Sequence, residues 1–224
     1  WDGIIKKIEN HTLTGHNGWE NTKQFFDVLN VTTNYVVLRN FEDLPDKILH
    51  PDIDILTDDV KNMSIIVNEE NQEIDLPITI GDHNISVDFR YQMGKRYDEK
   101  WAKDVLKRRI MYEGRFYVPC KEDYFYTLFY HNIGNDSKEY EKILIQLALE
   151  IGINENIVQV LNDDIKSKEF LKKYLTKMGY KQTNTKSRIG YKISHTETIR
   201  LVKVSIFLLN TYGIKFFLKK MIIK

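Results

Sequence analysis

Asp52 and Asp54 stand two residues apart in an apolar, β-branched segment at residues 50–56. Side chains of a strand alternate between its two faces, so both carboxylates share one face while Ile53 and Ile55 occupy the other. Two like charges on a half-buried strand destabilise it unless a cation lies between them. Carboxylate oxygens are the ligands that Mg²⁺ or Mn²⁺ prefers, so the spacing predicts a metal site.

A second segment, 84–91, carries one more acid in the same setting. Asp88 shares its predicted face with Ser86 and Arg90 and alternates with three apolar residues, Ile85, Val87 and Phe89. We therefore expect Asp88 to be the third ligand of the metal site. On this reading, replacing one of the three acids would remove activity and leave the fold intact.

The elements that must position these acids form an α+β protein, with a small mixed β-sheet followed by a helical half. Apolar spacing predicts an N-terminal helix over 17–29, and from residue 98 onward the periodicity is again helical. The alternation in between predicts strands at 34–39, 52–57, 63–68, 73–80 and 84–91. Most aromatic residues of the helical half are expected to lie in the core.

The order of a first strand, a short loop, an Asp-x-Asp pair and a later acid resembles the nucleotidyltransferase superfamily of DNA polymerase β type. The resemblance implies a nucleotidyltransferase-type sheet in which Asp52, Asp54 and Asp88 hold two Mg²⁺ ions and act in catalysis. Members usually carry a glycine followed by glycine or serine at the end of the first strand, whereas this chain has Arg39-Asn40.

Several residues near the acids are expected to bind phosphate. An arginine can hold a phosphate through charge and paired hydrogen bonds, which assigns that role to Arg39 beside Asn40. The remaining candidates are Arg90, on the face of Asp88, and the loop residues Lys95 and Arg96.

The expected function is transfer of a nucleotidyl group from a nucleoside triphosphate donor to a hydroxyl or phosphate of a small-molecule or glycan acceptor, as in surface-glycan biosynthesis. One alternative, suggested by the fukutin and phosphocholine-transferase branch, moves a phospho-alcohol from a CDP-alcohol to a glycan. A second is a catalytically silent module that binds a membrane or a partner. In the simplest structural alternative, Asp52 and Asp54 are solvent-facing residues of an edge strand.

Composition limits these readings. The chain of 224 residues is 42% hydrophobic and 29% charged with a net charge of +1, which is typical of a globular protein and not of a disordered one. A single cysteine, Cys120, excludes an internal disulfide. With no run of about eighteen apolar residues, we expect a cytoplasmic protein. Because it begins at Trp1, the chain is also a candidate module of a longer polypeptide.

The C-terminal segment differs from the rest in charge. Residues 181–224 contain ten basic residues and one acid, Glu197, so this segment carries +9 and the remainder −8. Apolar residues alternate with the lysines over 199–224, which is typical of an interfacial helix on the inner face of an anionic membrane. The expected organisation is a catalytic α/β core at 1–97, a helical domain at 98–180 and this basic segment.

Overall fold

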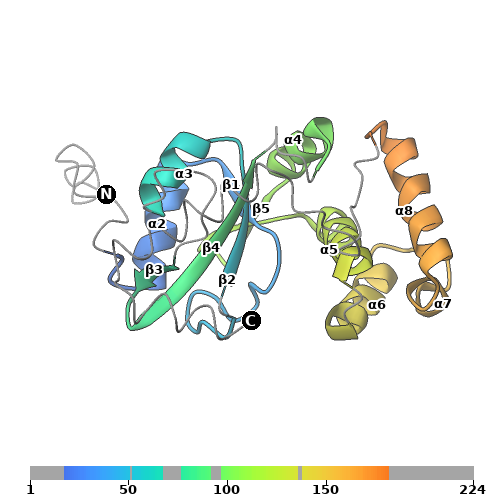
Figure 1. Ribbon diagram of the computed structural model, residues 1–224, viewed down its shortest axis with the longest axis horizontal. Helices are drawn as coiled ribbons and strands as arrows, with labels where there is room; N and C mark the ends of the chain where they lie inside the picture. The colour runs from blue at the N-terminus through green and yellow to red at the C-terminus, as the bar shows by residue number, and fades with distance from the viewer. Residues whose placement is uncertain (1–17, 51, 68–76, 92–96, 136–137, 182–224) are drawn as a thin grey trace, which may run out of the picture. The chain divides into compact units, whose positions relative to one another are not determined.

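A four-stranded mixed sheet forms the first half of the computed structural model, which describes residues 18–50, 52–67, 77–91, 97–135 and 138–181 (Figure 1). The strand order is β1-β2-β4-β3. β2 pairs antiparallel with β1 and parallel with β4, and β3 pairs antiparallel with β4. This sheet and its helices are α2 (Thr22–Thr32), β1 (Tyr35–Val37), β2 (Asp52–Thr57), α3 (Val60–Ile66), β3 (Pro77–Ile80) and β4 (His83–Tyr91).

The second half is helical apart from one small hairpin. Every described residue of the two halves belongs to one compact unit, and one hydrophobic core runs from Trp19 to Tyr180. The elements are α4 (Glu99–Lys107), β5 (Ile110–Tyr112), β6 (Phe116–Val118), α5 (Lys121–Asn135), η2 (Lys138–Tyr140), α6 (Glu141–Glu150), α7 (Ile157–Leu161) and α8 (Asp164–Met178). The α+β class and the small mixed sheet predicted from the sequence are confirmed.

Two local predictions were wrong. The strand expected at 63–68 is largely the helix α3, which begins after Asp59, whose side chain accepts a hydrogen bond from the backbone N–H of Asn62 at 3.0 Å. Parallel strands such as β2 and β4 must be joined by a crossover connection, and α3 is part of that connection. The β5–β6 hairpin was not expected, since strands of three residues carry too little alternation to be recognised.

The hairpin connects the two halves of the chain. Phe116 of β6 stacks on Phe26 of α2 with ring centroids 4.5 Å apart, and Tyr117 meets Tyr35 of β1 edge to face. All of these rings except Tyr117 are fully buried. The chain therefore returns to the sheet after residue 98, and the core continues across the boundary expected at residue 97.

A buried carboxylate fastens α4 to α5. Asp123 is fully buried and accepts hydrogen bonds from Arg108 Nε at 2.9 Å and Arg108 Nη2 at 2.6 Å. Tyr180, just after α8, donates to Asp104 of α4 at 2.9 Å. The paired bonds to Asp123 raise the pKa of Arg108 above its usual range. Cys120 donates to the same carboxylate at 3.2 Å, so the single thiol is part of this network.

Buried tyrosines make the fold sensitive to alkali. Burial raises the pKa of Tyr35, Tyr124 and Tyr174 well above the usual value of about 10. The unfolded chain then loses these protons at lower pH than the folded one, so stability is fully present below about pH 10 and declines as pH rises further. We expect the urea concentration at the midpoint of unfolding to fall steadily as the pH rises above this value.

The Tyr174→Phe variant isolates this effect, because the Tyr174 hydroxyl has no hydrogen-bond partner among the described residues. Its removal should cost little at neutral pH and should make the alkaline decline shallower than in the parent. Parallel declines for the two proteins would contradict the assignment.

Candidate functional site

Asp54 and Asp88 lie directly opposite one another on the two central strands of the sheet. β2 and β4 pair in parallel with Asp54 in register with Asp88 and Asp52 in register with Ser86. Residues in register on neighbouring strands project from the same face, and the strands are about 4.8 Å apart. The three acids predicted from the sequence therefore share one face of the sheet.

Their environments differ. Asp54 is only 2% exposed, whereas Asp52 and Asp88 are both half-buried. β2 is flanked by β1 and β4, so it is not an edge strand. The alternative in which Asp52 and Asp54 are solvent-facing residues of an edge strand is therefore wrong. A carboxylate as buried as that of Asp54 needs a specific partner.

Arg39 supplies that partner. Its guanidinium contacts the Asp54 carboxylate, and the two side chains are 8% and 2% exposed. The contact follows from the end of β1, where the backbone N–H of Leu38 donates to the Asp54 carbonyl at 2.8 Å and brings the next residue alongside β2. Arg39, expected to bind phosphate, is therefore joined to one of the predicted metal ligands.

This ion pair changes the expected effect of an Asp54 substitution. The sequence suggested that a lost carboxylate would relieve repulsion between acids. In the structure, a neutral residue at position 54 would leave the buried Arg39 guanidinium without this ion pair, which is destabilising.

The loop between β1 and β2 is held from the helical half as well. Asn40 donates through Nδ2 to the Tyr140 hydroxyl at 3.3 Å, and the Tyr124 hydroxyl donates to Glu42 Oε1 at 2.8 Å. Burial, followed by the Glu42 charge, raises the pKa of Tyr124. Phe41 packs on the Tyr124 ring with centroids 4.8 Å apart. This loop thus lies beside α5 and η2.

Sequence reasoning did not identify Glu42, Tyr124 or Tyr140 as neighbours of the loop. Tyr124 and Tyr140 are 82 and 100 residues from their partners, and no local pattern links such distant positions. The residue type of Asn40 is a weak sequence signal for a tight turn at the end of β1. In the structure, Asn40 adopts a left-handed backbone with φ of 56°. Asparagine tolerates this conformation better than most residues, and glycine adopts it readily.

The other predicted binding residues are only partly described. Arg90 belongs to β4 and is in register with Leu56, but its side chain lies outside the description. Lys95, Arg96 and the basic segment 199–224 also fall outside the described residues. Across the described ranges, none of the helices combines the length and apolar character needed to cross a bilayer.

Within the same ranges, no three His, Cys, Asp or Glu side chains come close enough together to hold a metal ion. The acids share a face, but Arg39 rather than a third carboxylate meets Asp54. The metal role of Asp52, Asp54 and Asp88 stays a prediction. No family model, curated protein or solved structure matches this chain.

Proposed function

We propose that the chain is a metal-dependent nucleotidyltransferase of DNA polymerase β type that transfers a nucleotidyl group from a nucleoside triphosphate to a hydroxyl or phosphate acceptor. The observation that carries the proposal is the register of Asp54 opposite Asp88, with Asp52 on the same face. Acids that share one face of adjacent parallel strands supply carboxylate oxygens, the ligand type that Mg²⁺ or Mn²⁺ prefers.

The end of β1 adds support. Asn40 has a left-handed backbone with φ of 56° in the Arg39-Asn40 pair, where members of the superfamily usually carry glycine followed by glycine or serine. Glycine adopts this conformation readily, so the backbone here is compatible with the resemblance. Arg39 already places positive charge against Asp54, so the acid face accommodates a cation. If Asp54 helps to hold Mg²⁺, Arg39 would lie beside the ion, where its guanidinium could also bind the triphosphate.

The roles proposed for the chain's residues follow from their burial. Asp54, almost fully buried, anchors the site, while the half-buried Asp52 and Asp88 are accessible to ligands. Asp88 accepts the proton of the acceptor hydroxyl, and Arg39 binds the phosphates together with Arg90, Lys95 and Arg96. When bound, Mg²⁺ would neutralise triphosphate charge and orient it for in-line transfer.

Ligand binding gives a direct test. We expect one nucleoside triphosphate to raise the thermal stability in the presence of Mg²⁺ and not in its absence, by about 2.7 kcal/mol at roughly 100 times its dissociation constant. The measurement is a thermal-shift screen of the four common nucleoside triphosphates and of CDP-alcohols. Stabilisation by a CDP-alcohol with release of CMP would instead support phospho-alcohol transfer.

The Asp82→Asn variant is a matched control, since Asp82 is an exposed residue of the turn between β3 and β4. It should keep the Mg²⁺-dependent shift that Asp52→Asn loses. The proposal is overturned in favour of the non-catalytic module if no nucleotide stabilises the protein, or if a nucleotide stabilises it equally with and without Mg²⁺.

A further inference from the structure

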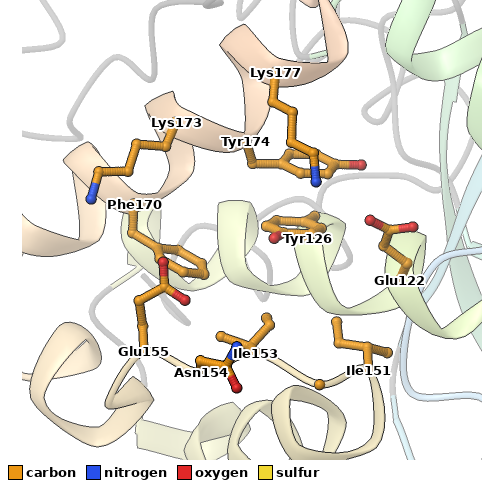
Figure 2. Close-up of a pocket in the computed structure, with 11 residues that line it drawn as sticks. Glu122, Tyr126, Ile151, Ile153, Asn154, Glu155, Phe170, Lys173, Tyr174 and Lys177 are labelled. Carbon is orange, nitrogen blue, oxygen red and sulfur yellow. The ribbon is translucent and has the colours of Figure 1, made fainter.

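The helical half contains a pocket that includes none of the residues assigned to the proposed transfer site. It has a volume of about 310 Å³ and lies between α5, α8 and the segment 151–155 that follows α6 (Figure 2). The residues that carry the argument are three aromatic, two acidic and two basic side chains, Tyr126, Phe170, Tyr174, Glu122, Glu155, Lys173 and Lys177.

The aromatic side chains form a layered wall. Tyr126 stacks on Tyr174 with ring centroids 3.3 Å apart and planes within 9°, and it lies nearly parallel to Phe170 at 6.1 Å. Phe170 and Tyr174 are buried, while Tyr126 is half-buried and lines the open space. The face of such a ring carries negative charge density that attracts organic ammonium groups.

Two carboxylates from different elements flank the aromatic wall. Glu122 belongs to α5 and lies beside Tyr126, and Glu155 belongs to the segment after α6 and lies beside Phe170 (Figure 2). Burial first, and then the charges of both glutamates, raise the pKa of Tyr126 to about 12. An ammonium group against this ring would therefore be attracted by the ring and by two carboxylates.

Lys173 and Lys177 lie one helical turn apart on α8, and Figure 2 shows the Lys177 ammonium beside the Tyr174 ring. Both lysines and both glutamates are exposed. In the part of the chain that the structure describes, no salt bridge joins a lysine of the pocket to a glutamate of the pocket. The lining therefore presents two positive and two negative charges that a ligand can meet separately.

We propose that this pocket binds a small zwitterion, with its alkylammonium group against Tyr126 and the two glutamates and its anionic group at Lys177. A simple cation would be repelled by the lysines and a simple anion by the glutamates. A ligand that carries both charges can place its cationic group at the glutamates and its anionic group at a lysine. This site is separate from the acid face, so it does not depend on the proposed transfer reaction.

Calorimetric titration of the full chain with four probes tests the proposal. Glycine betaine and phosphocholine carry an alkylammonium with a carboxylate or a phosphate, while choline and inorganic phosphate carry one charge type each. We expect at least one zwitterion to bind at least about tenfold more tightly than choline and phosphate, a difference of 1.4 kcal/mol. The better of the two zwitterions identifies the anionic group.

Variants place the binding in the pocket. Glu155→Gln, at an exposed position that should not affect folding, is expected to weaken zwitterion binding severalfold, and Tyr126→Leu about tenfold or more. Glu169→Gln, an exposed change on α8 outside the pocket, and Asp88→Asn should leave the affinity unchanged.

Three results would overturn the inference. They are equal affinity for choline and the zwitterions, no zwitterion binding at concentrations of about 10 mM, and a Glu155→Gln affinity equal to that of the parent. None of these results bears on the Mg²⁺-dependent stabilisation by nucleotides, so the two proposals fail separately.

Discussion

The Asp88→Asn variant is expected to lose between about a hundredfold and ten-thousandfold of its nucleotidyl transfer rate, the usual loss when a proton-accepting group is removed. Asp88 lies in register with Asp54 on the adjacent strand and is half-buried. Asparagine keeps the shape and the carbonyl oxygen but cannot accept the proton of the acceptor hydroxyl. The measurement is the rate of pyrophosphate release with the stabilising nucleotide and Mg²⁺.

The folded state should tolerate this change, which distinguishes lost chemistry from lost structure. Because Asp88 is half-buried rather than enclosed, replacing its charge should shift the unfolding free energy by about 1 kcal/mol or less. Asp82→Asn makes the same substitution at the exposed β3–β4 turn and should retain the full rate. A parental rate in Asp88→Asn would remove this residue from the mechanism.

Replacing Arg39 with methionine is expected to reduce the unfolding free energy by about 3–5 kcal/mol, the usual effect of breaking one side of a buried ion pair. The variant would leave Asp54, 2% exposed, without the guanidinium that contacts it. The double variant Arg39→Met with Asp54→Leu removes both charges and should be more stable than Arg39→Met alone. Urea unfolding at neutral pH measures all three free energies.

An exposed arginine provides the comparison for this cycle. Arg115 pairs with Asp46 at 2.7 Å, and both side chains are exposed, at 40% and 74%. Arg115→Met should therefore cost no more than about 1 kcal/mol. If Arg39→Met costs as little as Arg115→Met, or if the double variant is as unstable as the single one, Arg39 does not balance a buried charge on Asp54.

The sequence by itself determined the features that depend on neighbouring residues. Alternation over 52–57 and 84–91 placed the acids on one face of their strands, because side-chain direction in a strand repeats every two residues. Helical spacing likewise predicted the helical second half, and Trp101 in that half is buried, as expected for its aromatic residues.

Only the tertiary structure decided which of these faces meet. The register of Asp54 with Asp88 depends on how α3 carries the chain between two parallel strands, and the partner of Arg39 depends on the path of the loop after β1. The pocket around Tyr126 requires α5, α8 and the segment 151–155 to pack together. Local sequence cannot determine such pairings, because they follow from the packing of residues far apart in the chain, where burial decides which charges and rings come into contact.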